Sequence, residues 1–350
     1  MQPWLRTQSL GFPMIAMLNA VAALGEAVLQ PWQSVTLDYS AANSFMSNHY
    51  GCNPYFPAMT AVEPIFDARQ GVFDDDQGVV NKAALQVCGF ALHESPSSVA
   101  DWGDLEDVRD NYLPELRKVL RDAFGQQRIT HMVFWNPKLR GEEWEADGNT
   151  QYERTGIASL VHLDTDMLGF AGDTDALARM VERNRVESLI EGQPPVGAPL
   201  VGRGRELADA MGNGQRFAIV NAWRNVDPHS PVRRAPLAVM ATRYKPRPDG
   251  LMLVAPEAAP CAERSRWYTF PHMTSDEVLL FLQYDRSVHA PSDVWHCALP
   301  SVSEGDDARP RRSAELRALV VFDERVPHAD DRFSGAAVPR VTRLTEEDWR

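Results

Sequence analysis

The clearest periodic pattern in the chain lies between Ser97 and Phe124, where apolar residues recur at the spacing of one helix face. These positions are Trp102, Leu105, Val108, Tyr112, Leu116, Val119, Leu120 and Phe124. Acidic residues gather near the start of the stretch and basic residues near its end, which suits the helix dipole. We therefore predict an amphipathic helix here, with a role in the scaffold.

Short apolar runs bounded by turn-forming residues dominate the rest of the chain and predict β-strands. They are Ala84–Leu92, Ile129–Trp135, Ala158–Leu163, Phe217–Trp223, Leu237–Thr242, Leu251–Val254 and Leu316–Phe322. Two further stretches, Asp173–Ile190 and Asp276–Tyr284, have a helical pattern. Strands at irregular spacing with turns between them are typical of a sandwich or barrel. No G-x-G-x-x-G follows a strand, which argues against a dinucleotide-binding fold.

The N-terminal part has no such pattern. Residues 1–60 are rich in Ser, Asn and Pro and predict irregular structure. Within them, Leu10–Leu24 is apolar but too short to span a bilayer, so we favour a buried element over a signal peptide. Further along, Gly71–Gln77 reads as an acidic turn and Glu191–Gly204 as a surface loop.

Composition narrows the class of protein. A hydrophobic content of 44% and a charged content of 24% are ordinary for a globular chain. The net charge of −13 argues against a nucleic-acid or anionic-membrane partner, since either would require clustered Lys and Arg. The cysteines are widely spaced, with no C-x-x-C: Cys52, Cys88, Cys261 and Cys297. We expect reduced thiols, a cytoplasmic location and a monomer or homodimer.

Three residues of metal-binding type carry the candidate chemistry. His162 and Asp164 form an H-x-D pair, and in an extended segment such residues point the same way. With His296 they supply the two imidazoles and one carboxylate of a non-haem Fe(II) site, which leaves other positions open. His289 is a rival for the third position. On spacing alone, the pair also fits a buried histidine beside a turn-capping aspartate.

Ordered sequence blocks from about residue 130 to residue 323 resemble one family of enzymes. The blocks are Asn136–Arg140, Val161–Asp166, Val220–Arg224, Pro236–Val239, Arg266–Glu277, Trp295–Ala298 and Arg311–Val320. Their order and spacing are similar to the hydroxylase/desaturase group that includes the fungal gibberellin desaturase and the cephamycin methoxylation protein. The segment Trp295–Leu299 departs from the family pattern around the second histidine, so the substrate does not carry over.

The resemblance implies a mainly β fold with helical decoration (α+β), built on a double-stranded β-helix, or jelly roll. It also implies Fe(II) and 2-oxoglutarate as cofactors, O₂ as cosubstrate and a small-molecule substrate of secondary metabolism. We expect a single oxygenase domain over residues 1–350. Residues 1–128 would decorate it, residues 129–323 would form the jelly-roll core and residues 324–350 a tail.

An arginine is the natural partner for the distal carboxylate of 2-oxoglutarate, because its planar fork matches a carboxylate bidentately. Arg311 with Ser313 has the R-x-S form, while Arg317 begins an apolar run and would need an anionic partner there. Both arginines share one strand face, so the choice stays open. Arg224 is a second candidate anion clamp.

The expected reaction is hydroxylation, desaturation or cyclisation of a small metabolite, such as an amino acid, a peptide or another carboxylic acid. Arg224, Arg266 and Tyr268 are candidates for binding it. Since a halogenase of this type would lack the carboxylate, Asp164 argues for oxygenation or desaturation and against halogenation. The alternatives are a cupin-like metalloenzyme that does not use 2-oxoglutarate, and an inactive jelly-roll binding protein.

Overall fold

The structure of the protein is a computed structural model. The part of the chain it describes comprises residues 29–41, 60–74, 78–80, 83–125, 129–149, 152–164, 188–190, 209, 211–241, 266–286, 294–300, 302–305 and 307–325. Strands dominate these residues and helices are few, as predicted. No described helix is long and apolar enough to cross a membrane.

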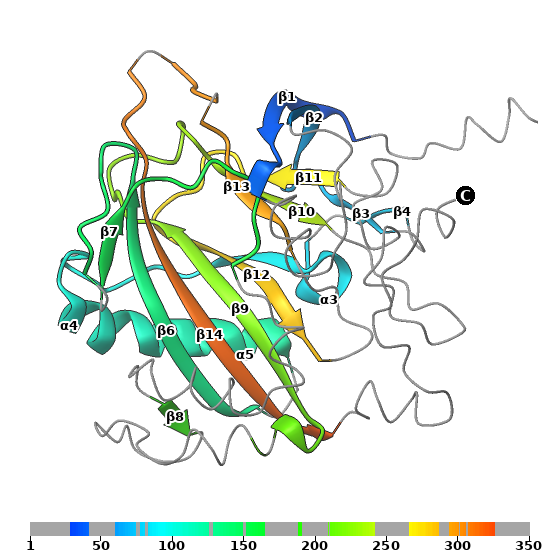
Figure 1. The fold of residues 1–350 in the computed structure, drawn as a ribbon, viewed down its shortest axis with the longest axis vertical. Coiled ribbons are helices and arrows are strands. Elements are labelled where there is room, and N and C mark those ends of the chain that lie inside the picture. The colour runs from blue at the N-terminus through cyan, green and yellow to red at the C-terminus, as the bar shows by residue number, and fades with distance from the viewer. Residues whose placement is uncertain are drawn as a thin grey trace, which may run out of the picture.

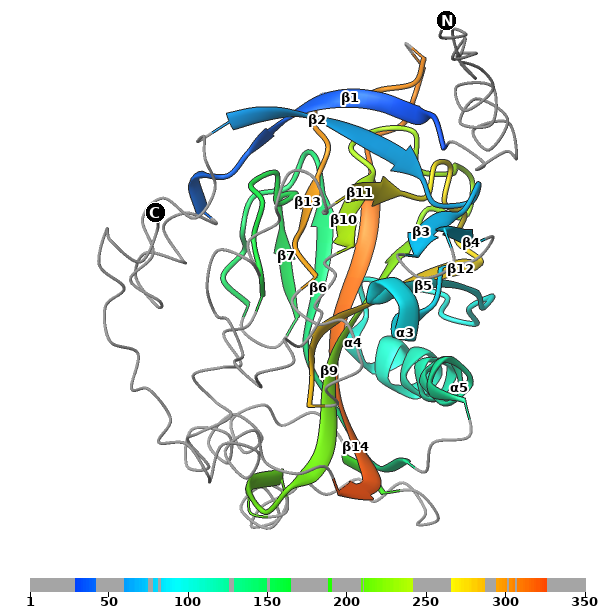
Figure 2. The same ribbon diagram turned by 90° about the vertical axis from the view of Figure 1, so that its right-hand side faces the viewer.

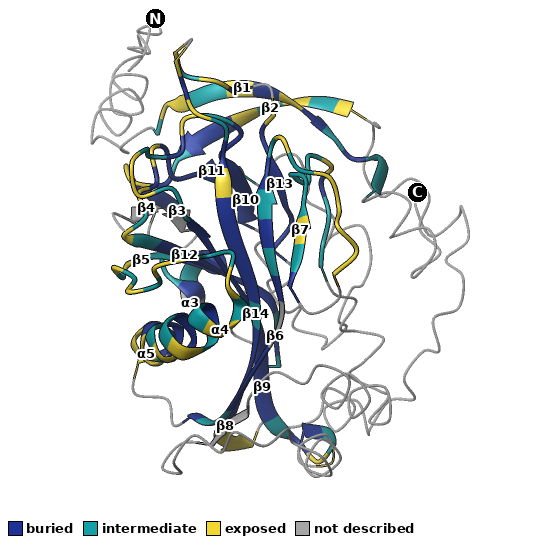
Figure 3. Ribbon diagram, turned by 90° about the vertical axis from the view of Figure 1, so that its left-hand side faces the viewer, coloured by how far each residue is buried: buried dark blue, intermediate teal, exposed yellow. Residues whose placement is uncertain are grey.

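The larger sheet forms the centre of the molecule (Figure 1). Its strand order is β5 (Phe90–Glu94), β12 (Glu277–Asp285), β9 (Gln215–Asn225), β14 (Arg312–Arg325), β6 (Ile129–Gly141) and β7 (Glu153–Thr155), and β8 (Ser188–Ile190) also pairs with β6. Strand β14 pairs antiparallel with both β9 and β6 over most of its length. Strand β9 is therefore buried along nearly its whole length, and β14 is mostly buried between Ser313 and Phe322 (Figure 3).

The smaller sheet carries the second histidine. Its order is β1 (Pro31–Asp38), β2 (Thr60–Asp67), β11 (Arg266–Thr269), β10 (Leu237–Ala241) and β13 (His296–Ala298). Strands β1 and β2 arch together over one end of the molecule (Figure 2). A separate short pair consists of β3 (Val72–Asp74) and β4 (Gly78–Val80). Strands from the first 128 residues thus take part in both main sheets.

The predicted helix is confirmed from Leu105 to Phe124, as α4 (Leu105–Asp107), a π-helical turn η1 (Val108–Tyr112) and α5 (Leu113–Phe124). It starts later than the pattern suggested, because Asp104 caps α4 by accepting a hydrogen bond from the Glu106 amide. Helix α5 lies across the larger sheet (Figure 1), and Phe124 packs edge-to-face on Phe322. One face of the sheet is therefore closed by helix.

Several predicted elements are wrong. The stretch Asp276–Tyr284, expected as a helix, is strand β12 between β5 and β9. Both its faces are buried, so the apolar run has no alternation to identify it as a strand. The predicted strand Ala84–Leu92 is divided into α3 (Leu85–Cys88) and β5, because Gly89 ends the helix at a φ of 83°.

Other boundaries also differ. Residues 31–38, expected to be irregular, form β1, and part of the predicted acidic turn at Gly71–Gln77 is β3. The end of the predicted helix Asp173–Ile190 is strand β8. The predictions for Leu10–Leu24, Glu191–Gly204, Leu251–Val254 and His289 lie outside the described residues.

Candidate metal centre and the polar strip beside it

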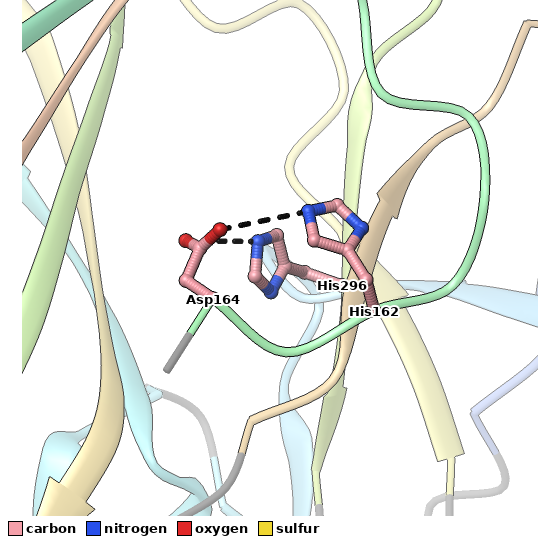
Figure 4. A group of neighbouring side chains, drawn as sticks. All are labelled: His162, Asp164 and His296. Atoms are coloured by element: carbon pink, nitrogen blue, oxygen red, sulfur yellow. Dashed lines mark ion pairs between the residues drawn. The ribbon is translucent and has the colours of Figure 1, made fainter. Parts of the chain in front are cut away.

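His162, Asp164 and His296 come together where the two sheets meet. The segment Ala158–Leu163 is not a strand, but its backbone bridges β13: the His162 amide donates to the His296 carbonyl, and the His296 amide donates to the His162 carbonyl, each at 3.1 Å. The Asp164 amide donates to Gln283 Oε1 on β12 at 2.9 Å. One ligand atom from each of the three side chains lies within 4.8 Å of the others (Figure 4).

The two imidazoles are oriented by backbone carbonyls. His162 Nδ1 lies 2.7 Å from the Leu160 carbonyl oxygen, and His296 Nδ1 lies 3.2 Å from that of Val294. A carbonyl only accepts hydrogen bonds, so each Nδ1 carries a proton and Nε2 is the ring nitrogen left to face a metal. The Nε2 atoms face Asp164, at 3.7 Å for His162 and 3.4 Å for His296.

The protonation states suit a divalent cation. Burial, with His296 close by, lowers the pKa of His162 to about 4, so its imidazole is neutral at pH 7. Burial acts to raise the pKa of Asp164, but His296 and Arg317 outweigh it and hold that pKa well below its usual range. The cluster thus combines two imidazoles, of which that of His162 is neutral, with one carboxylate, a donor set that a metal of the Fe(II) class binds.

Arg317 lies directly against the carboxylate of this cluster. Its Nη2 is 2.7 Å from Asp164 Oδ1, and Asn221 Nδ2 donates to Asp164 Oδ2. Arg317 stands opposite Asn221 in the pairing of β14 with β9, so both point to the same face of the larger sheet. Asp164 is therefore held from β14, β9 and β12.

A second carboxylate lies behind Arg317. Glu315 Oε1 is 3.9 Å from Arg317 Nη2, and Arg140 Nε donates to Glu315 Oε2 at 2.6 Å. Burial and the charge of Asp164 act to raise the pKa of Glu315, but Arg140 and Arg317 bring it below its usual value. Glu315 is therefore ionised inside the fold.

Arg311 and Ser313 lie further along the same face. Arg311 is buried over the Trp223 ring, with its Cζ 5.3 Å from the ring centroid, and its Nη1 donates to the Ala235 carbonyl at 2.6 Å. Burial lowers the pKa of Arg311 to about 10, which still leaves a cation at pH 7. Ala235 has a φ of 46°, a strained conformation for a residue with a side chain.

Buried polar atoms without a hydrogen-bond partner among the described residues gather on this face of the larger sheet. They are Asn221 Oδ1, Trp223 Nε1, Arg311 Nε, Ser313 Oγ, Glu315 Oε1 and Arg317 Nε. Burying such atoms costs free energy unless a ligand or a water molecule supplies the missing hydrogen-bond partner. We refer to these six residues as the polar strip, and its unpaired donors suit a ligand with carboxylate oxygens.

The other candidate residues are not brought to the cluster. Arg224 lies on the opposite face of β9, between the rings of Trp102 and Tyr112, at 5.3 and 5.2 Å from their centroids. Tyr268 is fully buried and packs on Phe66 and Phe90. Arg266 lies over Phe66.

Five residues of the site were missed from the sequence: Arg140, Asn221, Trp223, Gln283 and Glu315. Asn221 and Gln283 could have been found as single polar residues inside the apolar runs of β9 and β12. Nothing in the sequence indicates that Arg140 and Glu315 are paired, since they lie on different strands.

Comparison with known proteins gives a consistent picture. The profile of a family described as oxidoreductase/YMDC permease-like domain matches residues 37–186 and 201–321. Among curated relatives, the alpha-ketoglutarate-dependent dioxygenase phiK of a fungal species is 27% identical, over 68% of this chain and 79% of its own length. The hydroxylase/desaturase efuI of Hormonema carpetanum is 26% identical, over 74% of this chain and 85% of its own.

Another relative, the alpha-ketoglutarate-dependent dioxygenase tstK of Talaromyces stipitatus, is 25% identical over 71% of this chain and 82% of its own. Among solved structures, a variant of the iron and alpha-ketoglutarate-dependent endoperoxidase NvfI superimposes with a TM-score of 0.54 at 20% identity. The match covers 83% of this chain and 98% of the other. That likeness concerns the fold, and the predicted double-stranded β-helix is confirmed.

Proposed function

The chain belongs to the oxidoreductase/YMDC permease-like family and, with its relatives, to the Fe(II)/2-oxoglutarate-dependent hydroxylases and desaturases, and we propose that it oxidises a small metabolite at His162, Asp164 and His296. The observation that carries the proposal is the convergence of these three donors, within 4.8 Å, beside the polar strip. The products we expect are those of hydroxylation, desaturation or cyclisation.

The proposed iron ligands are the Nε2 atoms of His162 and His296 and the carboxylate of Asp164. Retention of the carboxylate favours oxygenation over halogenation. Bound Fe(II) and 2-oxoglutarate would supply the reducing equivalents that convert O₂ into an oxidant for an unactivated C–H bond. The chain itself keeps the His162 imidazole neutral and holds Asp164 through Arg317 and Asn221.

Arg311 and Ser313 are the proposed anchor for the distal carboxylate of 2-oxoglutarate. Arg317 is the weaker candidate, since its Nη2 already contacts Asp164 at 2.7 Å. Arg311 is buried, is held by the Ala235 carbonyl and the Trp223 ring, and keeps Nε without a partner among the described residues. A preorganised guanidinium beside an unpaired hydroxyl loses little freedom when it binds a carboxylate.

The substrate is proposed as a small organic molecule. We do not extend its binding site to Arg224, which faces the helices, or to Tyr268, whose side chain belongs to the core. An amino acid, peptide or other carboxylic acid, a cytoplasmic location and a monomer or homodimer all stay predictions from the sequence.

Anaerobic addition of Fe(II) and 2-oxoglutarate tests the assignment, because their joint binding gives a weak charge-transfer band in the visible region. His162→Ala should abolish the band, while His229→Ala, a change in an exposed turn, should preserve it. His289→Ala should also preserve it and His296→Ala should abolish it; the reverse result would give the third position to His289.

Succinate formation separates the proposal from its alternatives. A cupin-like enzyme that does not use the keto acid would bind Fe(II) and form no succinate. A binding protein would not bind Fe(II) at all. The unpaired donors of Arg311 and Ser313 favour the oxygenase.

A further inference from the structure

Four largely buried charges of alternating sign form a row that ends at the candidate metal centre. Arg140 Nε contacts Glu315 Oε2 at 2.6 Å, Glu315 Oε1 lies 3.9 Å from Arg317 Nη2, and that Nη2 contacts Asp164 Oδ1 at 2.7 Å. The side chains are only 12% exposed for Arg140, 8% for Glu315, 13% for Arg317 and 5% for Asp164. We call these four residues the charge row.

The position of Arg317 poses an electrostatic problem for a metal site. A guanidinium in contact with a metal-binding carboxylate repels the incoming cation and competes with it for the carboxylate oxygens. The repulsion is strong here because the groups are shielded from water. A neighbouring negative charge would offset it, and Glu315 is the carboxylate that adjoins Arg317 on β14.

Glu315 is well placed to hold Arg317. It lies on the same face of β14, two residues before Arg317, and it stands opposite Trp223 on β9 and Lys138 on β6. Arg140 fixes Glu315 in turn, while Arg140 Nη1 donates to the Gly156 carbonyl at 3.1 Å. Gly156 belongs to the segment that leads to His162, so the row connects β6 and β14 to the loop that carries the ligands.

We propose that Glu315, held by Arg140, is a positioning residue for the metal centre: it fixes the Arg317 guanidinium against one oxygen of Asp164 and offsets its charge, which leaves the carboxylate able to bind a divalent cation. The inference rests on the proposed function, since it takes Asp164 as a metal ligand. Glu315 acts through Arg317, so its effect depends on Arg317 being present.

Titration of the metal-free full-length protein with Co(II), followed by visible absorption, tests this without turnover. Glu315→Gln should weaken Co(II) binding about 10- to 100-fold, in the range found for groups that orient metal ligands. Glu153→Gln is the matched control, because Glu153 pairs with Lys138 at 2.8 Å at the edge of the same sheet and lies outside the charge row. It should change the affinity by less than about 2-fold, the effect expected of a partly exposed pair outside the charge row.

A double-mutant cycle distinguishes positioning from general stabilisation. In an Arg317→Met background the cation that needs offsetting is gone, so Glu315→Gln should then change the Co(II) affinity by less than about 2-fold. An equal loss in both backgrounds would overturn the proposal, as would a Glu315→Gln protein that binds Co(II) as tightly as Glu153→Gln.

Arg140→Gln covers the case in which Glu315→Gln does not fold. It keeps the Glu315 charge but releases its side chain, so Co(II) binding should weaken by a smaller factor, about 3- to 10-fold. A folded Arg140→Gln protein with wild-type affinity would overturn the role of the row. If the His162→Ala protein binds Co(II) as tightly as the wild type, the proposed function itself fails. If His162→Ala weakens Co(II) binding but Glu315→Gln does not, only this inference fails.

Discussion

The two faces of the central sheet each bury an arginine, and they use it differently. On the helix side, Arg224 is fully buried, and its Nη2 donates to the Ser95 carbonyl at 2.8 Å and to that of Ser275. The rings of Trp102 and Tyr112 cover it. On the other side, Arg317 contacts the carboxylates of Asp164 and Glu315.

The difference lies in the partners. Arg224 is surrounded mainly by neutral groups, with Glu115 at 4.0 Å, so it connects β9 to the segments before α4 and β12. Arg317 belongs to a row of charges whose balance an added cation would change. Burial alone does not identify an arginine that serves a site; the charges of its neighbours do.

The largest expected effect comes from the apolar side of β14. Leu316 is 2% exposed and packs in the core on the helix side. Leu316→Ala should lower the free energy of unfolding by about 2–5 kcal/mol, through lost burial and the cavity left behind. Urea unfolding measures this, with Val62→Ala as the control, since Val62 is 70% exposed. A Co(II) affinity that fell together with stability would mean that the two faces are not independent.

The next effect concerns the polar strip. Arg311→Ala should raise the 2-oxoglutarate concentration needed for succinate formation by about one to three orders of magnitude, because a charge-assisted contact in a dry site contributes about 2–4 kcal/mol. Arg317→Ala should lose stability more than affinity for the keto acid, since Arg317 pairs with Asp164. The two variants are compared by measuring succinate formation at increasing 2-oxoglutarate concentrations, together with their midpoints of thermal unfolding. A large shift for Arg317 with none for Arg311 would move the anchor to Arg317.

A smaller effect is expected at Arg224. Arg224→Met would leave the Ser95 and Ser275 carbonyls without their donor and should lower the free energy of unfolding by about 1–3 kcal/mol. The 2-oxoglutarate requirement should stay within about two-fold of wild type, because Arg224 faces the helices. Arg309→Met, at a 59% exposed side chain, is the matched control for loss of a charge. A keto-acid requirement that rose with Arg224→Met would restore this residue as an anion clamp.

The smallest effect belongs to an ion pair away from both faces. Arg69 binds Glu277 with two hydrogen bonds of 2.8 Å. Burial acts to raise the pKa of Glu277, but Arg69 and the Thr274 amide bring it below its usual value of 4.5. A lowered folded-state pKa means that the stabilisation is present above pH 4.5 and is lost as the pH falls through the folded-state pKa.

Glu277→Gln should therefore cost about 0.5–1 kcal/mol at pH 7 and progressively less below pH 4.5, as measured by unfolding of both proteins across that range. A difference that does not depend on pH would show that the charge of Glu277 is not what stabilises the fold.

The sequence predicted strands β6, β9 and β14 of the larger sheet because their apolar runs are long and bounded by turns. It misidentified β12, since a strand buried on both faces shows no alternation. It also missed β1, where apolar and polar residues alternate only weakly. The pattern of apolar and polar residues shows how many faces of a segment are buried. When both faces are buried, the apolar run is continuous and does not distinguish a helix from a strand.

By itself, the sequence determined the kind of chemistry, since His162, Asp164 and His296 are the donor types that Fe(II) binds. It also determined that Arg311, Ser313, Glu315 and Arg317 share a strand face, because side chains alternate along a strand. Only the tertiary structure decided that Arg317 contacts Asp164, while Arg311 is held by the Ala235 carbonyl and the Trp223 ring. That choice depends on where the segment that carries His162 and Asp164 pairs with β13, and on the pairing of β14 with β9, both of which join residues far apart in the chain.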